Sequence, residues 1–179
     1  MEMFALQENI ALELLRHPTK NVKSEEEILV LVKTLESLLG SNTSLSAPEI
    51  GVQSAVAIIR LPDFTLDLVN SEIISQSNPI ISHGEACFSF SAKFNCLRYA
   101  DVVVKNGLCE SVIQLTGKAA LLAQHHINHF DGTVYHDKVI RLTEVREDGS
   151  IKARGLCPCG SRRRFKECCM TLTPISTQR

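Results

Sequence analysis

Four cysteines near the carboxyl end of the sequence have a spacing that suits a metal site. Cys157, Cys159, Cys168 and Cys169 form the pattern C-x-C-x8-C-C within thirteen residues. Four soft thiolates this close together favour a closed tetrahedral zinc site, and so short a segment would depend on the metal for its folding energy. The pattern therefore predicts a structural zinc module, with free or redox-active cysteines as the alternative.

Residues 124–129, Gln-His-His-Ile-Asn-His, contain a second group of possible ligands. His125 and His129 are four residues apart, so on a helix both side chains project from one face within reach of a single metal ion. The same spacing also occurs in ordinary histidine clusters, and a metal site needs further ligands from elsewhere. Cys87 is the candidate, although a lone cysteine is more often buried and inert.

Helices are predicted where apolar residues recur at helical spacing. The segment from Ser24 to Gly40 begins with a capping box, in which Ser24 caps the helix and Glu27 occupies its third position. Gly40 is a natural helix end. A shorter helix is predicted at residues 10–15, and a helix over about 118–130 carries the histidines.

Strands are predicted where apolar side chains gather between turn residues. They are expected at residues 55–60, 64–69, 101–105 and 111–115, and residues 73–81 could form another. The pair at 101–105 and 111–115 is predicted to be a hairpin joined through Asn106-Gly107. Residues 41–54 are small and polar and are predicted to be a loop. Helix, strands and a late helix, in this order, indicate an α+β fold.

The composition is that of a soluble globular protein, with 179 residues of which 44% are hydrophobic and 22% charged. No apolar run approaches the roughly 18 residues of a membrane-spanning helix. The start lacks the features of a secretory signal, and seven cysteines are an odd number for a disulfide framework, so a cytoplasmic location is expected. An acidic body, net −7 over residues 1–151, carries a basic segment, net +5 over residues 152–169.

Three segments resemble, in order and spacing, the motifs of the peptide deformylase family. That family has G-x-G-L-A-A-x-Q, then E-G-C-L-S, then Q-H-E-x-D-H. Here residues 42–49 are Asn-Thr-Ser-Leu-Ser-Ala-Pro-Glu, residues 85–89 are Glu-Ala-Cys-Phe-Ser, and residues 124–129 complete the series. The resemblance covers about residues 10–142 and implies a peptide-deformylase-like fold, with antiparallel strands around a metal-binding helix.

The resemblance also implies a metal site and a reaction. By position, Cys87, His125 and His129 would hold a divalent metal, with a water in the fourth position. The family's usual metal is ferrous iron, although zinc or nickel can occupy the site, and ligand type does not choose among Fe2+, Zn2+ and Ni2+. The implied activity is removal of the N-formyl group from a formyl-methionyl peptide or nascent chain.

The sequence departs from the family at the catalytic positions. His126 replaces the catalytic glutamate, and Glu49 replaces the glutamine that helps to stabilise the oxyanion. In one interpretation catalysis survives, with His126 or Glu49 as the base. In the other, an ionised Glu49 repels the oxyanion and the chain is a non-catalytic pseudo-deformylase, unless burial keeps Glu49 protonated. Hydrolysis of another N-acyl group is a third possibility.

Other positions match substrate contacts of the family. The backbone N–H of Phe88 matches an oxyanion donor, and Ser44 and Leu45 fall in the motif beside the substrate. Arg98 matches an arginine near the downstream residues of the substrate, with a solvated surface charge as the alternative.

Residues 155–169 resemble the SEC-C zinc module, which occurs at the C-terminus of the SecA translocation motor. That resemblance implies a docking role, with the ribosome or a SecB-like chaperone as the possible partner. The basic residues of the module could meet ribosomal RNA or an acidic protein surface, with a solvated face as the alternative. The expected division of the chain is a peptide-deformylase-like domain at 1–142, a linker at 143–155, the SEC-C module at 156–170 and a tail at 171–179.

Overall fold

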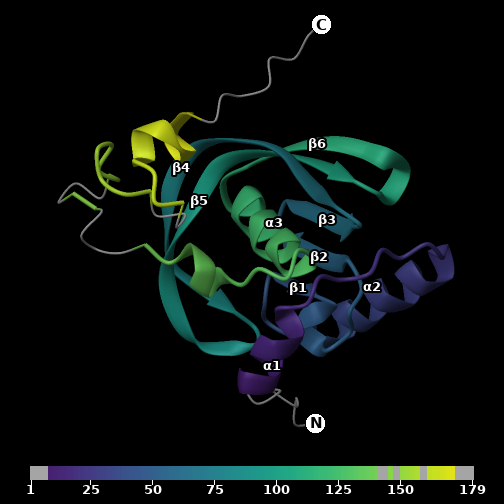
Figure 1. The fold of residues 1–179 in the computed structure, drawn as a ribbon. Helices are drawn as coiled ribbons and strands as arrows, with labels where there is room; N and C mark the ends of the chain where they lie inside the picture. The colour runs from purple at the N-terminus through teal and green to yellow at the C-terminus, as the bar shows by residue number, and fades with distance from the viewer. Residues whose placement is uncertain (1–7, 141–144, 147–149, 158–160, 172–179) are drawn as a thin grey trace, which may run out of the picture.

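The structure is a computed structural model that describes residues 8–140, 145–146, 150–157 and 161–171 (Figure 1). The helices are α1 (Glu8–Leu15), α2 (Glu25–Leu39) and α3 (Gly117–Phe130). The strands are β1 (Ser44–Ser46), β2 (Val56–Leu61), β3 (Phe64–Val69), β4 (Glu72–Cys87), β5 (Phe90–Asn106) and β6 (Ser111–Thr116). Short 3-10 helices are η1 (Pro48–Ile50), η2 (Leu108–Glu110), η3 (Tyr135–Lys138), η5 (Phe165–Glu167) and η6 (Cys169–Thr171).

The strands form two antiparallel sheets, ordered β1-β2-β3 and β4-β5-β6, and α3 lies between them (Figure 1). Side chains of β2 alternate between two cores because successive residues of a strand face opposite ways. Ala57 and Ile59 pack with the apolar face of α3, whereas Val56 and Ile58 pack with α2. This arrangement confirms the α+β class and buries most of α3 between Ala120 and Phe130, including its three histidines.

Helix α2 follows the sequence prediction closely. The Ser24 hydroxyl accepts a hydrogen bond from the backbone N–H of Glu27 at 3.3 Å, as an N-cap should. The helix ends at Gly40, whose positive φ of 58° suits a residue without a side chain. Leu31 and Leu35 are buried against the sheet of β1 and β2.

The second sheet is larger than the sequence indicated. Strand β4 has 16 residues and β5 has 17, where only residues 73–81 and 101–105 were predicted. Register shifts interrupt the pairing of the two strands at Ile73/Ser75, Ser82/Glu85 and Glu85/Cys87. Each shift moves side chains to the opposite face, so the simple alternation that identifies a strand is lost along their length.

Two turn predictions need correction. Residues 41–54 contain the short strand β1 and the helix η1, which a small, polar sequence did not reveal. The hairpin of β5 and β6 is confirmed, but its connection is longer than the two residues Asn106-Gly107. It includes η2, and Asn106 itself pairs with Ser111.

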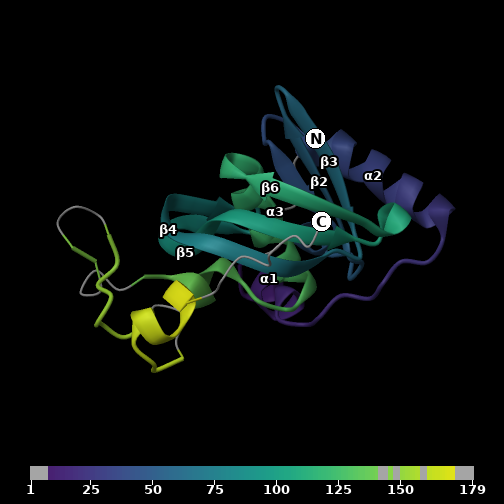
Figure 2. The ribbon, with the colours of Figure 1, turned by 90° about the horizontal axis from the view of Figure 1, so that it is seen from above.

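The C-terminal segment lies at one side of the body near β4 and β5 (Figure 2), and η6 contacts β4. Ile151, Cys157, Phe165 and Cys168 are buried in the same core cluster as strand residues of the body. Ile151 also pairs with Val145, so the segment predicted as a polar linker contributes to the core. Of the predicted tail, only Thr171 belongs to the described residues. None of the described helices is long and apolar enough to cross a membrane.

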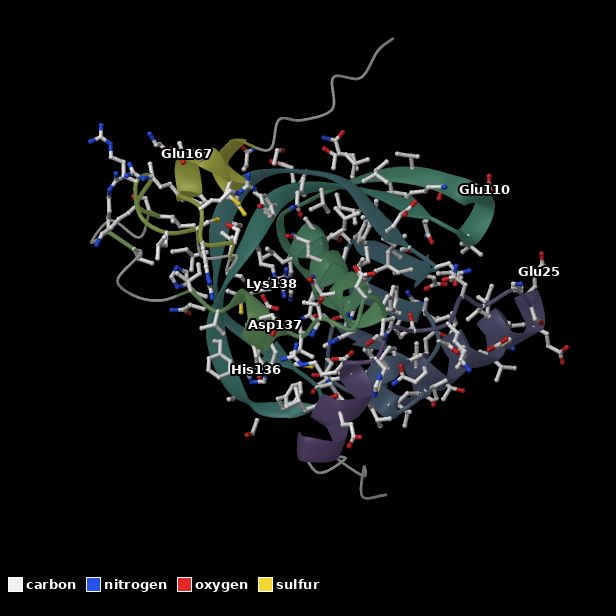
Figure 3. The ribbon with its side chains drawn as sticks, viewed as in Figure 1. Glu25, Glu110, His136, Asp137, Lys138 and Glu167 are labelled. Carbon is white, nitrogen blue, oxygen red and sulfur yellow. The ribbon has the colours of Figure 1, made fainter. Side chains whose placement is uncertain are left out.

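Helix η3 contacts the residue that follows α1 through an ion pair. Asp137, which lies on η3 in Figure 3, forms an ion pair with Arg16 and accepts a hydrogen bond from the backbone N–H of Val134 at 3.0 Å. Tyr135 is buried, and its hydroxyl donates to the carbonyl oxygen of Ala92 on β5 at 2.6 Å. These contacts hold the connection after α3 against the second sheet.

Candidate metal centre

Helix α3 carries three buried histidines, His125, His126 and His129. The Nε2 atoms of His125 and His129 are 3.1 Å apart, because residues four positions apart lie on one helical face. Gln124 holds this face toward β5, since its side chain bonds both the N–H and the carbonyl of Tyr99 at 2.9 and 2.8 Å. The helix is therefore fixed in rotation relative to the sheet.

Cys87 is the last residue of β4 and brings a sulfur to the two histidines. Its Sγ is 3.4 Å from Nε2 of His129 and is buried. The register shift between Glu85 and Cys87 turns the end of β4 at this point. Thus three donor atoms from two distant parts of the chain converge, with separations close to the roughly 3.3–3.6 Å edges of a tetrahedral zinc site. The residues fit a divalent metal.

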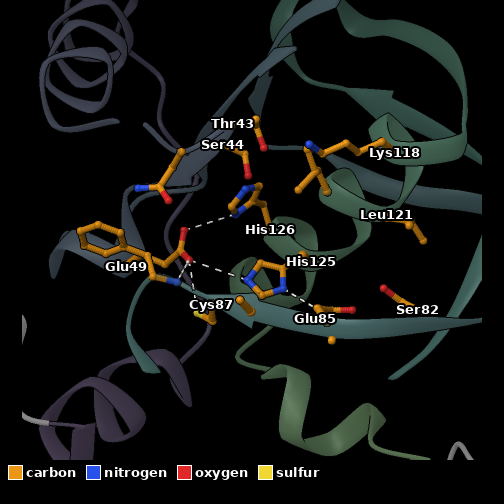
Figure 4. Close-up of a pocket in the computed structure, with 15 residues that line it drawn as sticks. Thr43, Ser44, Glu49, Ser82, Glu85, Cys87, Lys118, Leu121, His125 and His126 are labelled. Atoms are coloured by element: carbon orange, nitrogen blue, oxygen red, sulfur yellow. Dashed lines mark hydrogen bonds and ion pairs between the residues drawn. The ribbon is translucent and has the colours of Figure 1, made fainter. Parts of the chain in front are cut away.

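Glu49, on η1, completes the cluster (Figure 4). Its Oε1 is 3.2 Å from Sγ of Cys87 and 3.7 Å from Nε2 of His125, and it accepts from the Phe88 N–H at 3.3 Å. Its Oε2 accepts from the N–H and the hydroxyl of Ser46 at 2.9 and 2.7 Å. Donor atoms of Glu49, Cys87, His125 and His129 all lie within 4.8 Å of one another.

The charges of the cluster follow from burial and neighbours. Burial alone would raise the pKa of Glu49. The nearby histidines His126, His125 and His129 lower it by more than burial raises it, so the pKa lies well below its usual value. Glu49 is therefore ionised at neutral pH. This contradicts the interpretation from the sequence in which burial keeps Glu49 protonated. Burial and the Glu49 carboxylate raise the pKa of Cys87 to about 11, so a metal ion would displace the thiol proton on binding.

The pKa values of the three histidines are shifted in different directions. Burial lowers the pKa of His126, and burial together with His125 lowers the pKa of His129 to about 3. Burial also opposes the charge on His125, but Cys87, Glu49 and Glu85 raise its pKa well above the usual value. His126 is thus a neutral imidazole, with Nδ1 3.4 Å from Oε2 of Glu49.

Glu85 contacts the ring nitrogen of His125 that faces away from the cluster, and Arg98 in turn holds Glu85. Glu85 accepts from Nδ1 of His125 at 2.8 Å and from Nε of Arg98 at 2.8 Å. Arg98 is only 2% exposed and does not line the pocket at Glu49, so it is not the solvated surface charge offered as one alternative. Glu85 begins the motif that contains Cys87, but nothing in the sequence alone assigned it a role at the site.

A pocket of about 370 Å³ lies beside the cluster. Its wall includes Ser44, Phe88, His126, Leu121 and Leu122. The pocket therefore presents both polar and apolar surface to anything that reaches the candidate metal centre. Leu45, expected near the substrate, is instead buried in the core beneath α2 and does not line this pocket.

The C-terminal cysteines form a second cluster. Sulfur atoms of Cys157, Cys168 and Cys169 lie within 4.8 Å of one another, and all three residues are buried. Arg163 donates to Sγ of Cys168 at 3.3 Å. Cys159, the fourth predicted ligand, lies outside the described residues. The described part of the module is thus able to offer three thiolates to one ion.

Comparison with known proteins places these features in two sequence families. The family described as polypeptide deformylase matches residues 8–145, and the SEC-C motif matches residues 156–171. The peptide deformylase of Acetivibrio thermocellus is 32% identical over 142 residues, which cover 75% of this chain and 83% of that protein. Peptide deformylase 1 of Bacillus cereus is 26% identical over 152 residues, covering 76% and 97%.

Solved structures show the same relationship. A peptide deformylase from Legionella pneumophila superposes with a TM-score of 0.64 at 26% identity, covering 73% of this chain and 82% of that one. A peptide deformylase from Plasmodium falciparum shares the fold with a TM-score of 0.66 at 19% identity, covering 73% and 83%.

Proposed function

The chain belongs to the polypeptide deformylase family, and on this basis we propose that it is a divalent-metal hydrolase. It would release the formyl group from formyl-methionyl peptides or nascent chains. The observation that carries the proposal is the convergence of Cys87 Sγ with Nε2 of His125 and His129 beside a pocket. These three residues would hold Fe2+, Zn2+ or Ni2+. Such an ion supplies a Lewis acid and lowers the pKa of a water molecule that it binds.

Glu49 and His126 are the residues available for proton transfer. The ionised Glu49 carboxylate can take a proton from the attacking water, and the neutral His126 lies 3.4 Å away to share it. The proton then passes to the amine nitrogen as its bond to the formyl carbon breaks, so formate and a free N-terminus are the products. The chain would thus use a carboxylate on η1 where the family uses one on the helix.

Substrate would bind along the pocket wall. Leu121 and Leu122 offer an apolar surface for a methionine side chain, and Ser44 offers a polar group to the peptide backbone. The Phe88 N–H matches the family's oxyanion donor, but here it donates to Glu49. Glu49 would have to move before Phe88 could stabilise a developing negative charge.

The contact between Glu49 and Phe88 supports a second candidate function. If Glu49 stays in this position, the Phe88 N–H is already donated to Glu49 and is not available to an oxyanion. The fixed Glu49 carboxylate would also repel the negative charge that develops on the substrate oxygen. The protein would then bind metal and formylated peptides without hydrolysing them. Acting on another N-acyl group would meet the same obstacle.

Formate release from a formyl-Met peptide distinguishes the two functions. Purified full-length protein is loaded separately with Fe2+ without oxygen, with Ni2+ and with Zn2+, and formate is measured over time. The matched control is Cys87→Ser, which removes the sulfur donor and leaves Glu49 and His126 unchanged. Release by the wild type above the Cys87→Ser background supports the hydrolase. No release with any of the three ions, combined with binding of the formylated peptide, supports the second function.

For the C-terminal module we propose a structural Zn2+ held by Cys157, Cys159, Cys168 and Cys169. The match to the SEC-C motif and the buried cluster of described cysteines support it. We also propose that residues 1–142 form the catalytic domain and 156–170 a docking module for the ribosome or a SecB-like chaperone, with the protein in the cytoplasm. Two separate experiments test the two partners. One measures co-sedimentation of the protein with ribosomes, and the other measures its capture by the chaperone. Each compares the wild type with a variant in which a cysteine ligand of the module is replaced.

A further inference from the structure

We propose that Glu49 is a fourth protein ligand of the metal in the body of the chain, so that the resting site has no open coordination position. The site would be closed by one sulfur, two nitrogens and one carboxylate oxygen. The inference depends on the metal site of the proposed function, but it does not depend on whether the protein hydrolyses a substrate.

The distances among the donor atoms support a closed site. Glu49 Oε1 lies 3.2 Å from Cys87 Sγ, 3.7 Å from His125 Nε2 and 3.9 Å from His129 Nε2. A tetrahedron built with common zinc–ligand lengths has edges of roughly 3.3–3.6 Å, so the distance to sulfur is slightly shorter than such an edge and the two distances to nitrogen are slightly longer. The carboxylate oxygen therefore stands at the corner that three protein ligands would otherwise leave to water.

The other carboxylate oxygen is held in place. Oε2 of Glu49 accepts two hydrogen bonds from Ser46, one from its N–H and one from its hydroxyl. Glu49 is 4% exposed and follows Pro48 in η1, so its backbone and side chain are both restrained. A carboxylate fixed through one oxygen presents the other toward the donors at little further cost in conformational entropy.

The charges also balance in a closed site. A divalent ion bound by the Cys87 thiolate alone would leave one uncompensated positive charge in a buried location, which is unfavourable. A Glu49 carboxylate bound to the ion would cancel that charge. Glu85 does not need to serve this purpose, because it is already paired with Arg98. The closed site is therefore neutral, with its nearest buried ion pair neutral as well.

A closed site has a consequence for access. An incoming ligand has to displace the Glu49 carboxylate before it reaches the metal. The same displacement frees the Phe88 N–H, since Glu49 Oε1 is the acceptor of that hydrogen bond. One side chain thus controls both the coordination position and the neighbouring hydrogen-bond donor.

Azide binding to the cobalt-loaded protein tests the closure. Co2+ with a thiolate ligand has visible absorption bands that change when an added anion enters the coordination sphere. Full-length wild type, Glu49→Gln and the matched control Glu72→Gln, an exposed glutamate on β4, are each titrated with azide. Azide-induced difference spectra are recorded, so the constant contribution of the C-terminal cysteines cancels.

The closed site predicts that azide leaves the spectra of wild type and Glu72→Gln unchanged. Glu49→Gln should bind azide with an apparent Kd at least about tenfold below the highest azide concentration that leaves the wild-type spectrum unchanged, because a neutral amide is a weak metal ligand and the fourth position opens. Competition with a chromophoric chelator should show Zn2+ affinity for this variant reduced by at least about tenfold. Glu49→Asp, which keeps the charge on a shorter side chain, should bind azide with intermediate affinity.

Equal azide affinity of wild type and Glu49→Gln would overturn the inference. The wild-type titration is decisive even if a variant does not fold, because an azide-induced spectral change in the wild type means that the Glu49 carboxylate does not close the coordination position to this anion. Formate release is measured on the same preparation. Release from a wild type that binds azide refutes the closed site and keeps the hydrolase. An azide-insensitive wild type that releases no formate keeps the closed site and refutes the hydrolase.

Discussion

Glu85 accepts a hydrogen bond from Nδ1 of His125 at 2.8 Å. This contact sets the imidazole tautomer, because a proton on Nδ1 leaves the Nε2 lone pair directed at the candidate metal centre. Arg98 holds the Glu85 carboxylate through both oxygens. A buried ion pair outside the metal-binding cluster thus orients a residue within it.

Changing Glu85 to glutamine should weaken metal binding without removing a proposed ligand. The amide still occupies the same volume but loses the charge that opposes Arg98, so Zn2+ affinity should fall by about 10–100-fold. Leaving Arg98 unpaired should also cost about 3–5 kcal/mol of unfolding free energy. Chelator competition and urea denaturation measure the two effects.

The double variant Glu85→Gln with Arg98→Met is the control for the ion pair. It should recover part of the lost stability, since no buried charge remains unpaired, yet its metal affinity should stay low. Unchanged Zn2+ affinity in Glu85→Gln would contradict the positioning role.

Restoring the family's pattern of catalytic residues should raise activity only when two positions change together. His126→Glu alone puts a second carboxylate beside Glu49, whose Oε2 is 3.4 Å from the present Nδ1, and like charges at this distance destabilise each other. Adding Glu49→Gln removes the repulsion. The double variant should release formate at least about 100-fold faster than His126→Glu. Equal rates for the two variants would show that the other departures from the family motifs limit activity.

The ion pair between Arg16 and Asp137 should make stability depend on acidity. Burial raises the pKa of Asp137, but Arg16 and the Val134 N–H lower it below its usual value. The contribution is therefore present above the unfolded-state pKa of about 3.9 and is lost as pH falls through the lower folded-state pKa. Both side chains are more than a third exposed, 44% and 35%, so the effect at pH 7 should be at most about 1 kcal/mol.

Urea denaturation of wild type and Asp137→Asn measures this contribution. The difference in unfolding free energy should be greatest near neutral pH and should shrink toward pH ~3. Arg16→Met removes the partner of Asp137, so the difference in unfolding free energy caused by Asp137→Asn should be smaller when Arg16→Met is also present. A gap between wild type and Asp137→Asn that grows on acidification would contradict the assignment.

Cys157→Ser should remove about one zinc ion per chain, because a cluster that loses a thiolate binds zinc far more weakly. The body should stay folded and keep its own metal. The melting temperature should nevertheless fall, since Phe165 and Ile151 share the core of the body strands. Metal analysis and circular dichroism provide the measurements. The matched control Cys96→Ser, at a buried cysteine outside both clusters, should retain both metals, and zinc retained by Cys157→Ser would count against the module.

The local elements with a strong pattern could be predicted from the sequence. The helix expected over about 118–130 is α3 (Gly117–Phe130), and the segment from Ser24 to Gly40 contains α2 with the expected cap. Helical periodicity and capping are properties of neighbouring residues, so they need no knowledge of the rest of the chain. The spacing of His125 and His129 likewise determined that the two rings lie together on one face.

Other features depend on contacts between distant residues. The lengths of β4 and β5 are set by pairing across irregular registers, which no local pattern records. From the sequence, Arg98 was either a contact near the substrate or a solvated surface charge, and only packing against Glu85 makes it part of a buried ion pair. Ile151 belongs to a polar stretch and is buried because the module folds back on the body.

The sequence by itself determined the α+β class, the family motifs and which side chains carry metal-binding atoms. The tertiary structure alone decided that Oε1 of Glu49 lies next to Cys87 and the two histidines while Oε2 is held by Ser46. The position of a side-chain oxygen depends on the torsion angles of η1 and on two sheets that meet around α3. A motif specifies the residue type, but only the packed chain specifies the direction of its carboxylate.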